Sequence, residues 1–313
     1  MELRNLGRSG LRVSLVGLGC NNFGGRIEIE ASRKVVHKAL DLGITLFDTA
    51  DTYGNFGGSE TCLGEILGAR RKDIVLASKF GMPMNAEGTI KGASRRYIVS
   101  EVEASLKRLK TDWIDLYQLH QPDPLTPIEE TLRALDDLVH QGKVRYIGCS
   151  NLPAWQVVEA QWTARELGLN AFVSAQDEYS LVVRDIDREL IPALQAYDIG
   201  LLPFFPLASG LLTGKYKRNA ALPSGTRLAN AQRLADRFLT EANWQIAERL
   251  QDFATTRGHS LLELAFSWLA CRPQVASVIA GATRPEQVEA NVRAVECNLT
   301  PDDLAEVDRL RIE

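Results

Sequence analysis

The chain has 313 residues, of which 45% are hydrophobic and 24% are charged, and its formal net charge is −4. This composition is typical of an enzyme with a large buried core, and the absence of a basic block gives no reason to expect a nucleic-acid partner. No run of about 18 apolar residues predicts a membrane span, and the N-terminus lacks the apolar segment of a signal peptide. The five cysteines form no CxxC pair and fit no simple disulfide framework, which favours a reducing, cytoplasmic location.

Short apolar or β-branched runs recur from one end of the chain to the other, and segments with helical spacing separate them. Ile98, Val102 and Leu109 share one helical face, for example. The motifs "TPIE" at 126–129 and "TPDD" at 300–303 each predict a capped helix start, with Thr126 as the N-cap of the first. Eight strands are predicted, at 15–19, 44–50, 73–80, 114–120, 144–150, 171–176, 199–205 and 275–282.

Eight strand–helix alternations predict an α/β fold with parallel strands, because each crossover helix returns the chain to the same end of the sheet. A doubly wound open sheet and a closed (β/α)8 TIM barrel both satisfy this pattern. Eight repeats without a linker favour the barrel, as a single domain over residues 1–313. The stretch "LRNLGRSGLRVS" at 3–14 predicts an extra β-hairpin that caps the barrel.

Two glycine-rich stretches resemble phosphate-binding motifs but depart from them. In "GLGCNNFGG", Asn22 occupies the third glycine position of a dinucleotide fingerprint. In "SGLLTGKY", Ser209 stands where a P-loop needs its first glycine. Neither motif alone predicts a nucleotide site.

Polar residues at the carboxyl ends of the predicted strands are the candidates for chemistry, because a barrel carries its active site there. Read singly, Lys79 could form a structural ion pair with Asp48, His120 could be an interior histidine, and Tyr53 could be a rim aromatic. Together they form a proton-transfer device, in which Lys79 lowers the pKa of Tyr53 and Asp48 holds the lysine. His120 can orient a carbonyl oxygen. Because neither an activated nucleophile nor a metal-ligand cluster is evident, the pattern favours protonation of an oxyanion while a hydride attacks carbon.

The segments "FDTADTYG", "ASKFG", "SLKRLKTDWIDLYQLHQPD", "GKVRYIGCSN", "PLASGLLTGKY" and "GATRPEQVEANV" resemble the aldo-keto reductase superfamily in order and over nearly the whole chain. The resemblance implies a (β/α)8 barrel that reduces carbonyls with a nicotinamide cofactor and without metal. Tyr53 matches the general acid, Lys79 and Asp48 the pair that tunes it, and His120 the carbonyl-orienting residue. A small carbonyl substrate is expected to contact Asn21, Phe23, Tyr53 and His120.

The resemblance also implies the cofactor site. Ser150, Asn151 and Gln176 match the residues that hold the nicotinamide carboxamide, Phe204 matches the ring that stacks on it, and 206–215 match the loop over the pyrophosphate. The implied cofactor-binding residues are Gly19, Cys20, Asn21, Asp48, Ser150, Asn151, Gln176, Phe204, Phe205, Pro206, Leu207, Ser209, Gly210, Lys215, Gly281, Thr283, Gln287 and Asn291.

NADPH is the expected cofactor, on an argument from charge. Pro285 marks a helix start after the eighth strand, where unpaired N–H groups can seat a phosphate. Arg284 lies at that start, and Arg227 in the segment after the seventh strand can close over the same group. Gly281 stands where some branches of the family place a lysine for this phosphate. Cys20, Asn21 and Asn22 replace the family's more usual threonine or aromatic residues, which predicts a more polar mouth.

Two other functions fit parts of the pattern. A cofactor-binding regulatory subunit is the first, because the potassium-channel beta subunits share this scaffold and many of these motifs. A non-redox isomerase or aldolase that uses Lys79 as a Schiff base is the second. A homo-oligomer is compatible with the sequence but is not indicated by it.

Overall fold

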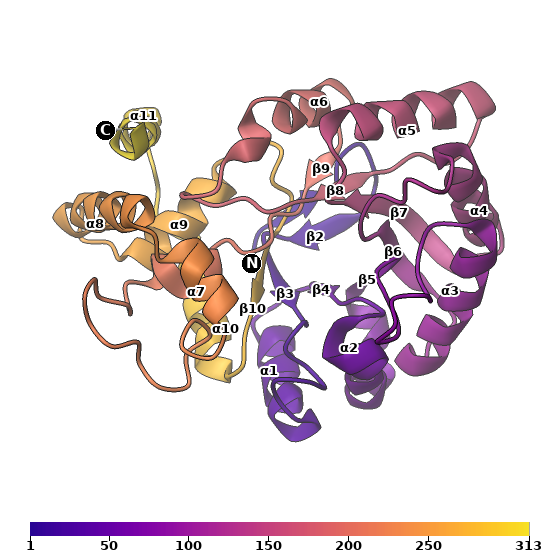
Figure 1. Ribbon diagram of the computed structural model, residues 1–313, viewed down its shortest axis with the longest axis horizontal. Coiled ribbons are helices and arrows are strands. Elements are labelled where there is room, and N and C mark those ends of the chain that lie inside the picture. The colour runs from indigo at the N-terminus through magenta and orange to yellow at the C-terminus, as the bar shows by residue number, and fades with distance from the viewer. Residues whose placement is uncertain (313) are drawn as a thin grey trace.

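A computed structural model describes residues 1–312. Its centre is a curled sheet of eight parallel strands in the order β10-β3-β4-β5-β6-β7-β8-β9 (Figure 1). The strands are β3 (Val16–Gly19), β4 (Leu46–Asp48), β5 (Val75–Phe80), β6 (Ile114–Leu119), β7 (Val144–Ser150), β8 (Ser174–Gln176), β9 (Gly200–Leu201) and β10 (Val278–Gly281). All eight predicted strands are therefore present, although β9 is much shorter than the apolar run that predicted it.

The sheet closes between β9 and the segment that enters β10. The Leu201 N–H donates to the carbonyl of Gln274 at 2.7 Å, and the Ala276 N–H donates to the carbonyl of Leu201 at 3.0 Å. Farther along, the Ile279 N–H donates to the carbonyl of Pro203 at 3.1 Å. These bonds satisfy the edge groups that an open sheet would expose. The closed barrel is confirmed over the doubly wound alternative.

Helices surround the sheet, and three of them lie between β9 and β10, where a simple repeat would have one. In Figure 1 the C-terminal helix α11 lies beside α8, away from the barrel. The helices are α1 (Ile29–Asp41), α2 (Tyr53–Leu67), α3 (Arg95–Leu109), α4 (Ile128–His140), α5 (Ala154–Leu167), α6 (Leu190–Ala196), α7 (Gln232–Phe238), α8 (Glu241–Thr256), α9 (Leu261–Ala270), α10 (Pro285–Arg293) and α11 (Pro301–Ile312). Three 3-10 helices accompany them, η1 (Gly68–Asp73), η2 (Asp185–Asp187) and η3 (Ala208–Thr213). None of the helices within residues 1–312 is both long and apolar enough to cross a bilayer.

The two predicted capping motifs have different outcomes. At "TPDD", the Thr300 hydroxyl accepts from the Asp303 N–H at 3.2 Å, and the Asp303 carboxylate accepts from the Thr300 N–H at 3.0 Å. This reciprocal pair confirms the predicted cap of α11. At "TPIE" the prediction is wrong, because α4 has Pro127 as its N-cap and no side-chain cap. The Thr126 hydroxyl instead donates to the carboxylate of Asp123 at 2.8 Å.

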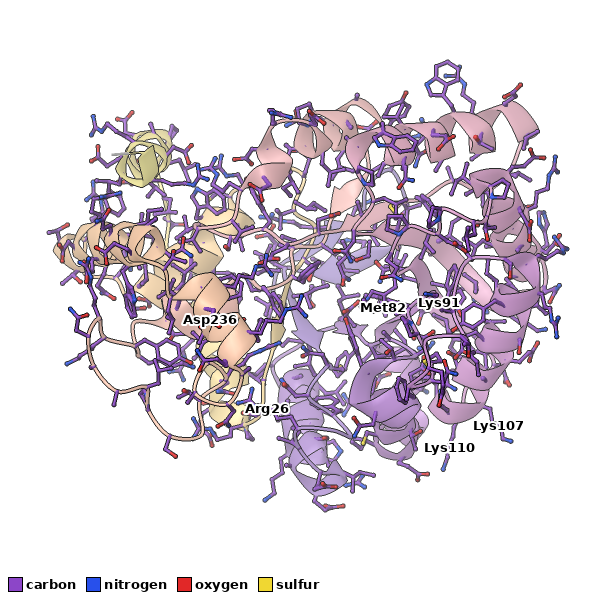
Figure 2. The ribbon with its side chains drawn as sticks, viewed as in Figure 1. Arg26, Met82, Lys91, Lys107, Lys110 and Asp236 are labelled. Atoms are coloured by element: carbon purple, nitrogen blue, oxygen red, sulfur yellow. The ribbon has the colours of Figure 1, made fainter. Side chains whose placement is uncertain are left out.

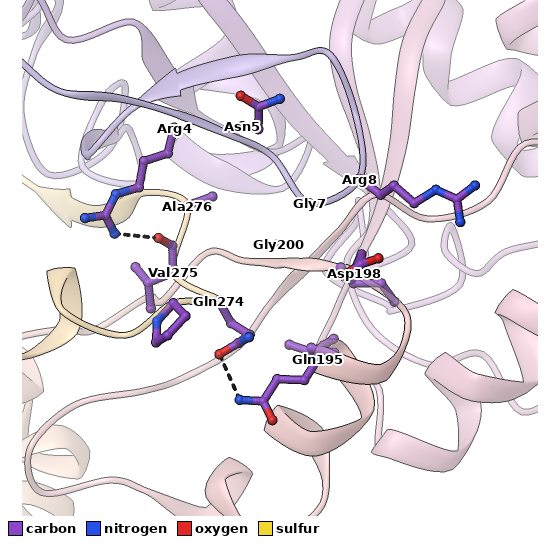
Figure 3. A pocket seen from close by; sticks show the side chains of 13 residues that line it. Arg4, Asn5, Gly7, Arg8, Gln195, Asp198, Gly200, Gln274, Val275 and Ala276 are labelled. Carbon is purple, nitrogen blue, oxygen red and sulfur yellow. Dashed lines mark hydrogen bonds between the residues drawn. The ribbon is translucent and has the colours of Figure 1, made fainter.

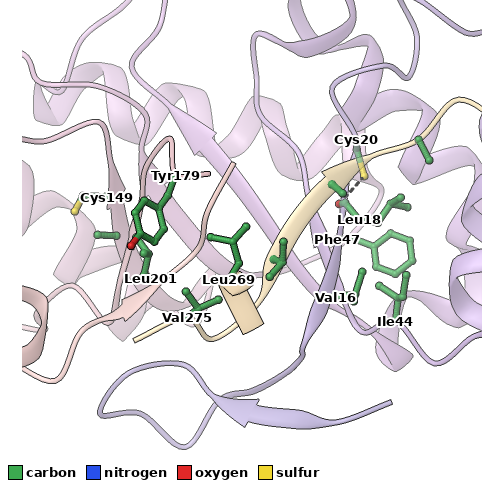
Figure 4. Close-up of a cluster of buried hydrophobic side chains, with 14 of the residues drawn as sticks. Val16, Leu18, Cys20, Ile44, Phe47, Cys149, Tyr179, Leu201, Leu269 and Val275 are labelled. Atoms are coloured by element: carbon green, nitrogen blue, oxygen red, sulfur yellow. Dashed lines mark hydrogen bonds between the residues drawn. The ribbon is translucent and has the colours of Figure 1, made fainter. Parts of the chain in front are cut away.

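An antiparallel hairpin of β1 (Leu3–Asn5) and β2 (Arg12–Ser14) covers the amino ends of the barrel strands, as predicted. Its Leu6 and Val13 are fully buried and pack against Leu46, Leu116 and other residues inside the barrel. The hairpin therefore closes the floor of the barrel with apolar side chains. A second, larger core lies between the strands and the helices; Figure 4 shows part of it around β3, β10 and β9.

A cavity of about 420 Å³ lies on this amino-terminal side of the molecule, far from the strand ends that carry the predicted chemistry. It is bounded by the turn of the hairpin, the end of α6 and residues 273–276 (Figure 3). Arg4 donates to the carbonyl of Val275 at 3.0 Å, and the Gln195 amide donates to Gln274 at 3.0 Å across it. None of the predicted site residues lines this cavity.

Candidate active site

The four predicted catalytic residues meet at the carboxyl ends of three neighbouring strands. Asp48 ends β4, Lys79 is the penultimate residue of β5, and His120 directly follows β6. Tyr53 reaches the same place from a tight turn at the start of α2. The next four residues, Gly54 to Gly57, all have positive φ, so regular helix begins only after them. Gly54 is required here, because a Cβ at that position would lie 2.4 Å from the carbonyl oxygen of Phe23.

Lys79 links the set. Its Nζ lies 2.6 Å from Oδ2 of Asp48, 3.0 Å from the carbonyl oxygen of Thr49 and 3.4 Å from the hydroxyl of Tyr53. The ammonium thus has an acceptor for each of its three protons. Lys79 is fully buried and Asp48 is 3% exposed, so this is an ion pair inside the barrel mouth.

Burial and charge act on the two central groups in opposite ways. Burial raises the pKa of Tyr53, and the neighbouring Lys79 lowers it without cancelling the effect of burial. The lysine therefore acts in the predicted direction, but the net pKa of Tyr53 in the ligand-free protein lies above its usual value. For Lys79, burial lowers the pKa, whereas Asp48 and Tyr53 raise it and prevail. At neutral pH the lysine is an ammonium and the tyrosine a phenol.

His120 lies beside Tyr53, with ring centroids 5.6 Å apart and the rings nearly perpendicular. Burial, and then the positive charge of Lys79, hold the pKa of His120 well below its usual value. Its Nδ1 is buried without a hydrogen-bond partner. The imidazole is therefore neutral at pH 7 and keeps one N–H with which it can donate to a substrate oxygen.

Asp48 is held by two amides as well as by the lysine. Gln176 donates to its Oδ1 at 2.8 Å, and Gln118 donates to the same oxygen at 3.3 Å. Gln118 was not predicted from the sequence. Its signal was present, because a glutamine two residues before His120 in an apolar strand must point to the same side of the sheet as His120.

Ser150 and Asn151 lie at the end of β7, as predicted, and are connected to their neighbours. The Ser150 hydroxyl donates to the carbonyl of Gln176 at 2.8 Å, and the Asn151 amide donates to the carbonyl of His120 at 2.9 Å. Asn151 itself has a φ of 60°, which turns the chain sharply at the mouth. The three residues expected to hold a carboxamide therefore lie together with His120.

The segment after β9 has the features of an anion-binding loop. Ala208, Ser209 and Gly210 all have positive φ, and the N–H groups of Ala208 and Gly210 donate to the carbonyls of Phe205 and Leu207 at 2.9 and 2.8 Å. The Ser209 hydroxyl is buried without a partner, and the Lys215 ammonium approaches Gly210 so closely that a Cβ there would lie 2.9 Å from it. A buried hydroxyl without a partner and a nearby lysine fit the pyrophosphate of a dinucleotide. Phe204 and Phe205 precede the loop with ring centroids 5.4 Å apart.

The turn after β3 meets the end of β10. Asn22 is buried and donates to the carbonyl of Ala282 at 3.3 Å, while the Asn21 side chain approaches Gly281. Cys20 is fully buried, and its N–H donates to the carbonyl of Asp48 at 2.8 Å. Phe23 is also fully buried in the core, so its predicted contact with substrate stays a prediction.

The first turn of α10 forms the remaining part of the predicted cofactor site. Arg284 is the N-cap residue, Pro285 follows it, and Arg284 makes no side-chain capping bond. Gln287 accepts from the N–H of Thr283 at 2.7 Å, and Asn291 is buried farther along the helix. Arg227 lies elsewhere, with its guanidinium 4.7 Å above the ring of Phe205.

Arg26, labelled in Figure 2, donates to the carbonyl of Gly225 at 3.4 Å, and its charge adds to the effect of burial in lowering the pKa of Arg227. The positive charge that was predicted to meet at one phosphate therefore lies in two places: Arg284 is at the start of α10, and Arg227 is beside Phe205. Among residues 1–312, no group of three or more His, Cys, Asp and Glu side chains is arranged to hold a metal ion.

Comparison with known proteins identifies the class that this fold and site define. The sequence pattern of the aldo/keto reductase family matches residues 15–312. The chain belongs to the aldo/keto reductase family and is an oxidoreductase of that family.

Individual relatives carry different names. The chain is 38% identical to a probable voltage-gated potassium channel subunit beta of Arabidopsis thaliana, over 99% of this chain and 96% of that protein. It is 37% identical to the L-glyceraldehyde 3-phosphate reductase of Escherichia coli K12, over 99% of this chain and 92% of the relative. It is 36% identical to an uncharacterized oxidoreductase of Bacillus subtilis, over 97% and 94% of the two chains.

Proposed function

We propose that the protein reduces an aldehyde or ketone to the alcohol with NADPH, and that Tyr53 is the proton donor. The observation that carries the proposal is the buried Lys79, which joins Asp48 on one side to the Tyr53 hydroxyl on the other. A bound nicotinamide would supply the hydride that forms the new C–H bond. The protein's own contribution is to deliver a proton to the carbonyl oxygen and to orient that oxygen.

The protonation states of Tyr53 and His120 fit these two roles, proton donation and orientation of the carbonyl oxygen. Tyr53 holds its proton at neutral pH, and the phenolate that remains after proton transfer would lie against the Lys79 ammonium. The neutral His120 would donate to the same oxygen as negative charge develops on it. The site lies at the carboxyl end of the barrel, between the turn that carries Tyr53 and the loop after β9.

The residues proposed to hold the cofactor surround this point. Ser150, Asn151 and Gln176 would hold the carboxamide, and Phe204 would stack on the nicotinamide. The loop from Pro206 to Lys215 would cover the pyrophosphate, and the start of α10 would bind the adenosine end. The orphaned Ser209 hydroxyl supports this assignment, because a buried polar group without a partner is costly unless a ligand satisfies it.

A Schiff-base mechanism at Lys79 is disfavoured by the same geometry. A nucleophilic amine must be neutral, whereas the Lys79 ammonium has three acceptors and a pKa raised by Asp48 and Tyr53 against the effect of burial. Borohydride trapping with a carbonyl substrate would reveal such an adduct, and we expect none.

The second candidate function is that of a cofactor-binding regulatory subunit, and the relatives that carry the name of a potassium channel subunit beta favour it. NADPH oxidation would separate the two functions. The assay would use a nitrobenzaldehyde, methylglyoxal and L-glyceraldehyde 3-phosphate, the last because of the name of one relative. Sustained turnover with any of them supports a reductase. Tight NADPH binding without turnover on a wide aldehyde panel supports a regulatory subunit.

The decisive variant is Tyr53→Phe, which keeps the ring and removes the proton. General acids contribute about 10²–10⁴-fold, so turnover should fall by at least that range while NADPH affinity changes little. Fluorescence titration measures the affinity, and NADPH absorbance measures turnover. Tyr197→Phe, at the end of α6, is a control that should keep wild-type turnover. A Tyr53→Phe enzyme with most of its activity would remove Tyr53 from the mechanism.

A further inference from the structure

On the outer face of β5, α2 and α3 enclose a group of acids with one cation. Arg108 of α3 donates to the carboxylate of Glu60 at 2.7 Å and also to that of Glu101. The Ser78 hydroxyl donates to the other oxygen of Glu60. Glu60 is fully buried and Glu101 is 7% exposed, so both acids depend on the one guanidinium for compensation.

Asp51 belongs to the same group but has no cation of its own. It is fully buried, and no lysine, arginine or histidine among residues 1–312 forms an ion pair with it. Lys107 and Lys110 at the end of α3 point outward from the molecule (Figure 2), and Lys110 pairs with the exposed Glu65. Of the three carboxyl groups, Glu60 and Glu101 share the Arg108 guanidinium, and Asp51 does not contact it.

The hydrogen bonds of Asp51 connect the turn that leads to Tyr53 with β5 and with α3. Its N–H donates to the carbonyl of Lys79 at 3.1 Å, and its Oδ1 accepts from the N–H of Thr52 at 2.7 Å. Its Oδ2 lies 3.3 Å from the hydroxyl of Tyr97 on α3. Both carboxyl oxygens are therefore used, one by the turn and the other by the neighbouring helix.

We propose that Asp51 is a positioning residue whose uncharged carboxyl group, held in place by Tyr97, fixes the turn that carries Tyr53. The Tyr97 hydroxyl donates to Oδ2 across the 3.3 Å contact, which an uncharged carboxyl oxygen can also accept, while Oδ1 accepts from the Thr52 N–H. The inference rests on the proposed role of Tyr53 and adds two residues, Asp51 and Tyr97, that support the proton donor from behind.

Burial and the surrounding charges both favour the uncharged form of the Asp51 carboxyl group. Burial raises the pKa of Asp51 well above its usual value, and the charges of Glu101 and Glu60 add to this effect. The Thr52 N–H and Arg108 oppose it without prevailing. The other titratable groups that face this site are Tyr97 from α3, Tyr117 from β6, and Tyr53 with the paired Asp48 and Lys79 at the mouth. The hydroxyl of Tyr117 is buried without a partner.

The uncharged state matters for proton donation. Negative charge on Asp51 would raise the pKa of Tyr53 further, because Asp51 is one of the groups that act on it. A carboxyl group that fixes the turn without carrying charge avoids this effect. An uncharged amide of the same shape, as in Asp51→Asn, should therefore support the turn as well as the carboxyl group does.

The test compares Asp51→Asn, Asp51→Ala and Tyr97→Phe with the wild-type enzyme, by measuring kcat and KM from pH 6 to pH 10 with one aldehyde and NADPH. Asp51→Asn should keep kcat within about threefold and leave the alkaline limb of the pH profile in place. Asp51→Ala should lose about ten- to a hundredfold in kcat, because the turn is no longer held in the geometry that proton transfer needs. Tyr97→Phe should lose a smaller factor with unchanged NADPH affinity. The matched control is Tyr146→Phe on β7, which should keep wild-type kcat.

Two outcomes would overturn the inference. A shift of the alkaline limb to lower pH in Asp51→Asn would show that the wild-type residue is charged. Full activity in Asp51→Ala and Tyr97→Phe would show that neither residue positions Tyr53. Should the wild-type protein turn over no aldehyde, the proposed function fails, yet the charge of Asp51 is still measurable. The infrared difference spectrum between wild type and Asp51→Asn at pH 7 must contain the band of a protonated carboxyl group, and its absence would refute the uncharged state.

Discussion

Among single residues, Lys79 is the one whose charge affects the largest number of predicted site residues. Its charge compensates Asp48, its position sets the environment of Tyr53, and it has no contact with solvent. Removing the ammonium would leave the Asp48 carboxylate uncompensated in the barrel mouth, held only by the amides of Gln118 and Gln176.

Lys79→Met keeps the length of the side chain and removes its charge. We expect loss of turnover together with a loss of stability of roughly 3–5 kcal/mol, since breaking a buried ion pair leaves one charge unpaired. Denaturant unfolding and steady-state kinetics measure the two effects. Lys72→Met, at an exposed lysine in η1, is the matched control and should change neither. Persistent activity with an unaltered pH profile would disprove the tuning role.

Asp177 is expected to make the stability of the folded protein depend on pH. It is 8% exposed, its Oδ2 is buried without a partner, and burial raises its pKa from 3.8 to about 8, against the opposing effect of the Asn151 N–H. Because the folded-state pKa lies above the unfolded one, its contribution to stability is fully present below about pH 4 and is lost as pH rises to about 8.

Asp177→Asn, which does not titrate, should therefore gain in melting temperature relative to wild type as pH rises from 4 to 8. A difference of 1 kcal/mol corresponds to about 2–4 °C in larger domains. Thermal unfolding without cofactor at several pH values measures the trend. Asp303→Asn is the control: the hydroxyl and N–H of Thr300 lower the pKa of Asp303 to about 2, so this difference should be flat between pH 5 and 8. A flat difference for Asp177→Asn as well would show that Asp177 is ionised in the folded protein.

At the scale of the element, the start of α10 is expected to decide between the two nicotinamide cofactors. Arg284 occupies the N-cap without using its side chain as a cap, so the guanidinium is available to a phosphate beside the free N–H groups of the first turn.

Arg284→Ala should weaken NADPH about ten- to a hundredfold, because a hydrogen bond to a charged group contributes roughly 1.5–3 kcal/mol. NADH lacks the phosphate and should bind the variant almost as well as the wild type. Dissociation constants for both cofactors decide the question. Arg293→Ala, in the last turn of the same helix, should leave both unchanged. Equal losses for the two cofactors would contradict a phosphate-specific role.

Features that depend only on a local run of residues could be predicted from the sequence, whereas features that depend on packing between distant segments could not. The eight strands follow from apolar runs, and the α11 cap follows from Thr300 and Asp303, which lie three residues apart. The cap at Thr126 could not be judged locally, because Asp123 competes for its hydroxyl. The support of Asp48 by Gln118 depends on which side of a strand faces the mouth. The charge balance around Asp51 depends on the packing of α2 against α3, and the net pKa of Tyr53 depends on how deeply it is buried.

In the whole molecule, the predicted active site and the apolar hairpin that closes the barrel lie at opposite ends of the strands. The strand carboxyl ends hold the charged site, whereas the hairpin seals the amino ends with Leu6 and Val13. A change at the floor should therefore affect the stability of the fold and leave the site intact.

Leu6→Ala should cost about 2–5 kcal/mol, the usual range for a buried leucine, because the hairpin can relax only partly into the space left behind. Denaturant unfolding measures the loss, and kcat under native conditions should stay at the wild-type value. Leu3→Ala, at a leucine that is 39% exposed in the same hairpin, is the control and should cost far less. Similar small losses for both would show that the hairpin is not part of the core.

The polar centre at Asp48 also constrains how the barrel can assemble. Its three partners come from β5, β6 and β8, so side chains of four strands must arrive at one point. A slip of one residue in the pairing of any of these strands turns its side chains to the other face of the sheet. A slip of β4 or β5 would leave a carboxylate or an ammonium buried without its counterpart, and a slip of β6 or β8 would remove an amide that donates to Asp48. Hydrophobic contacts alone would penalise such slips far less. The groups proposed to transfer the proton therefore also act as a register check, which penalises misaligned barrels before any substrate is bound.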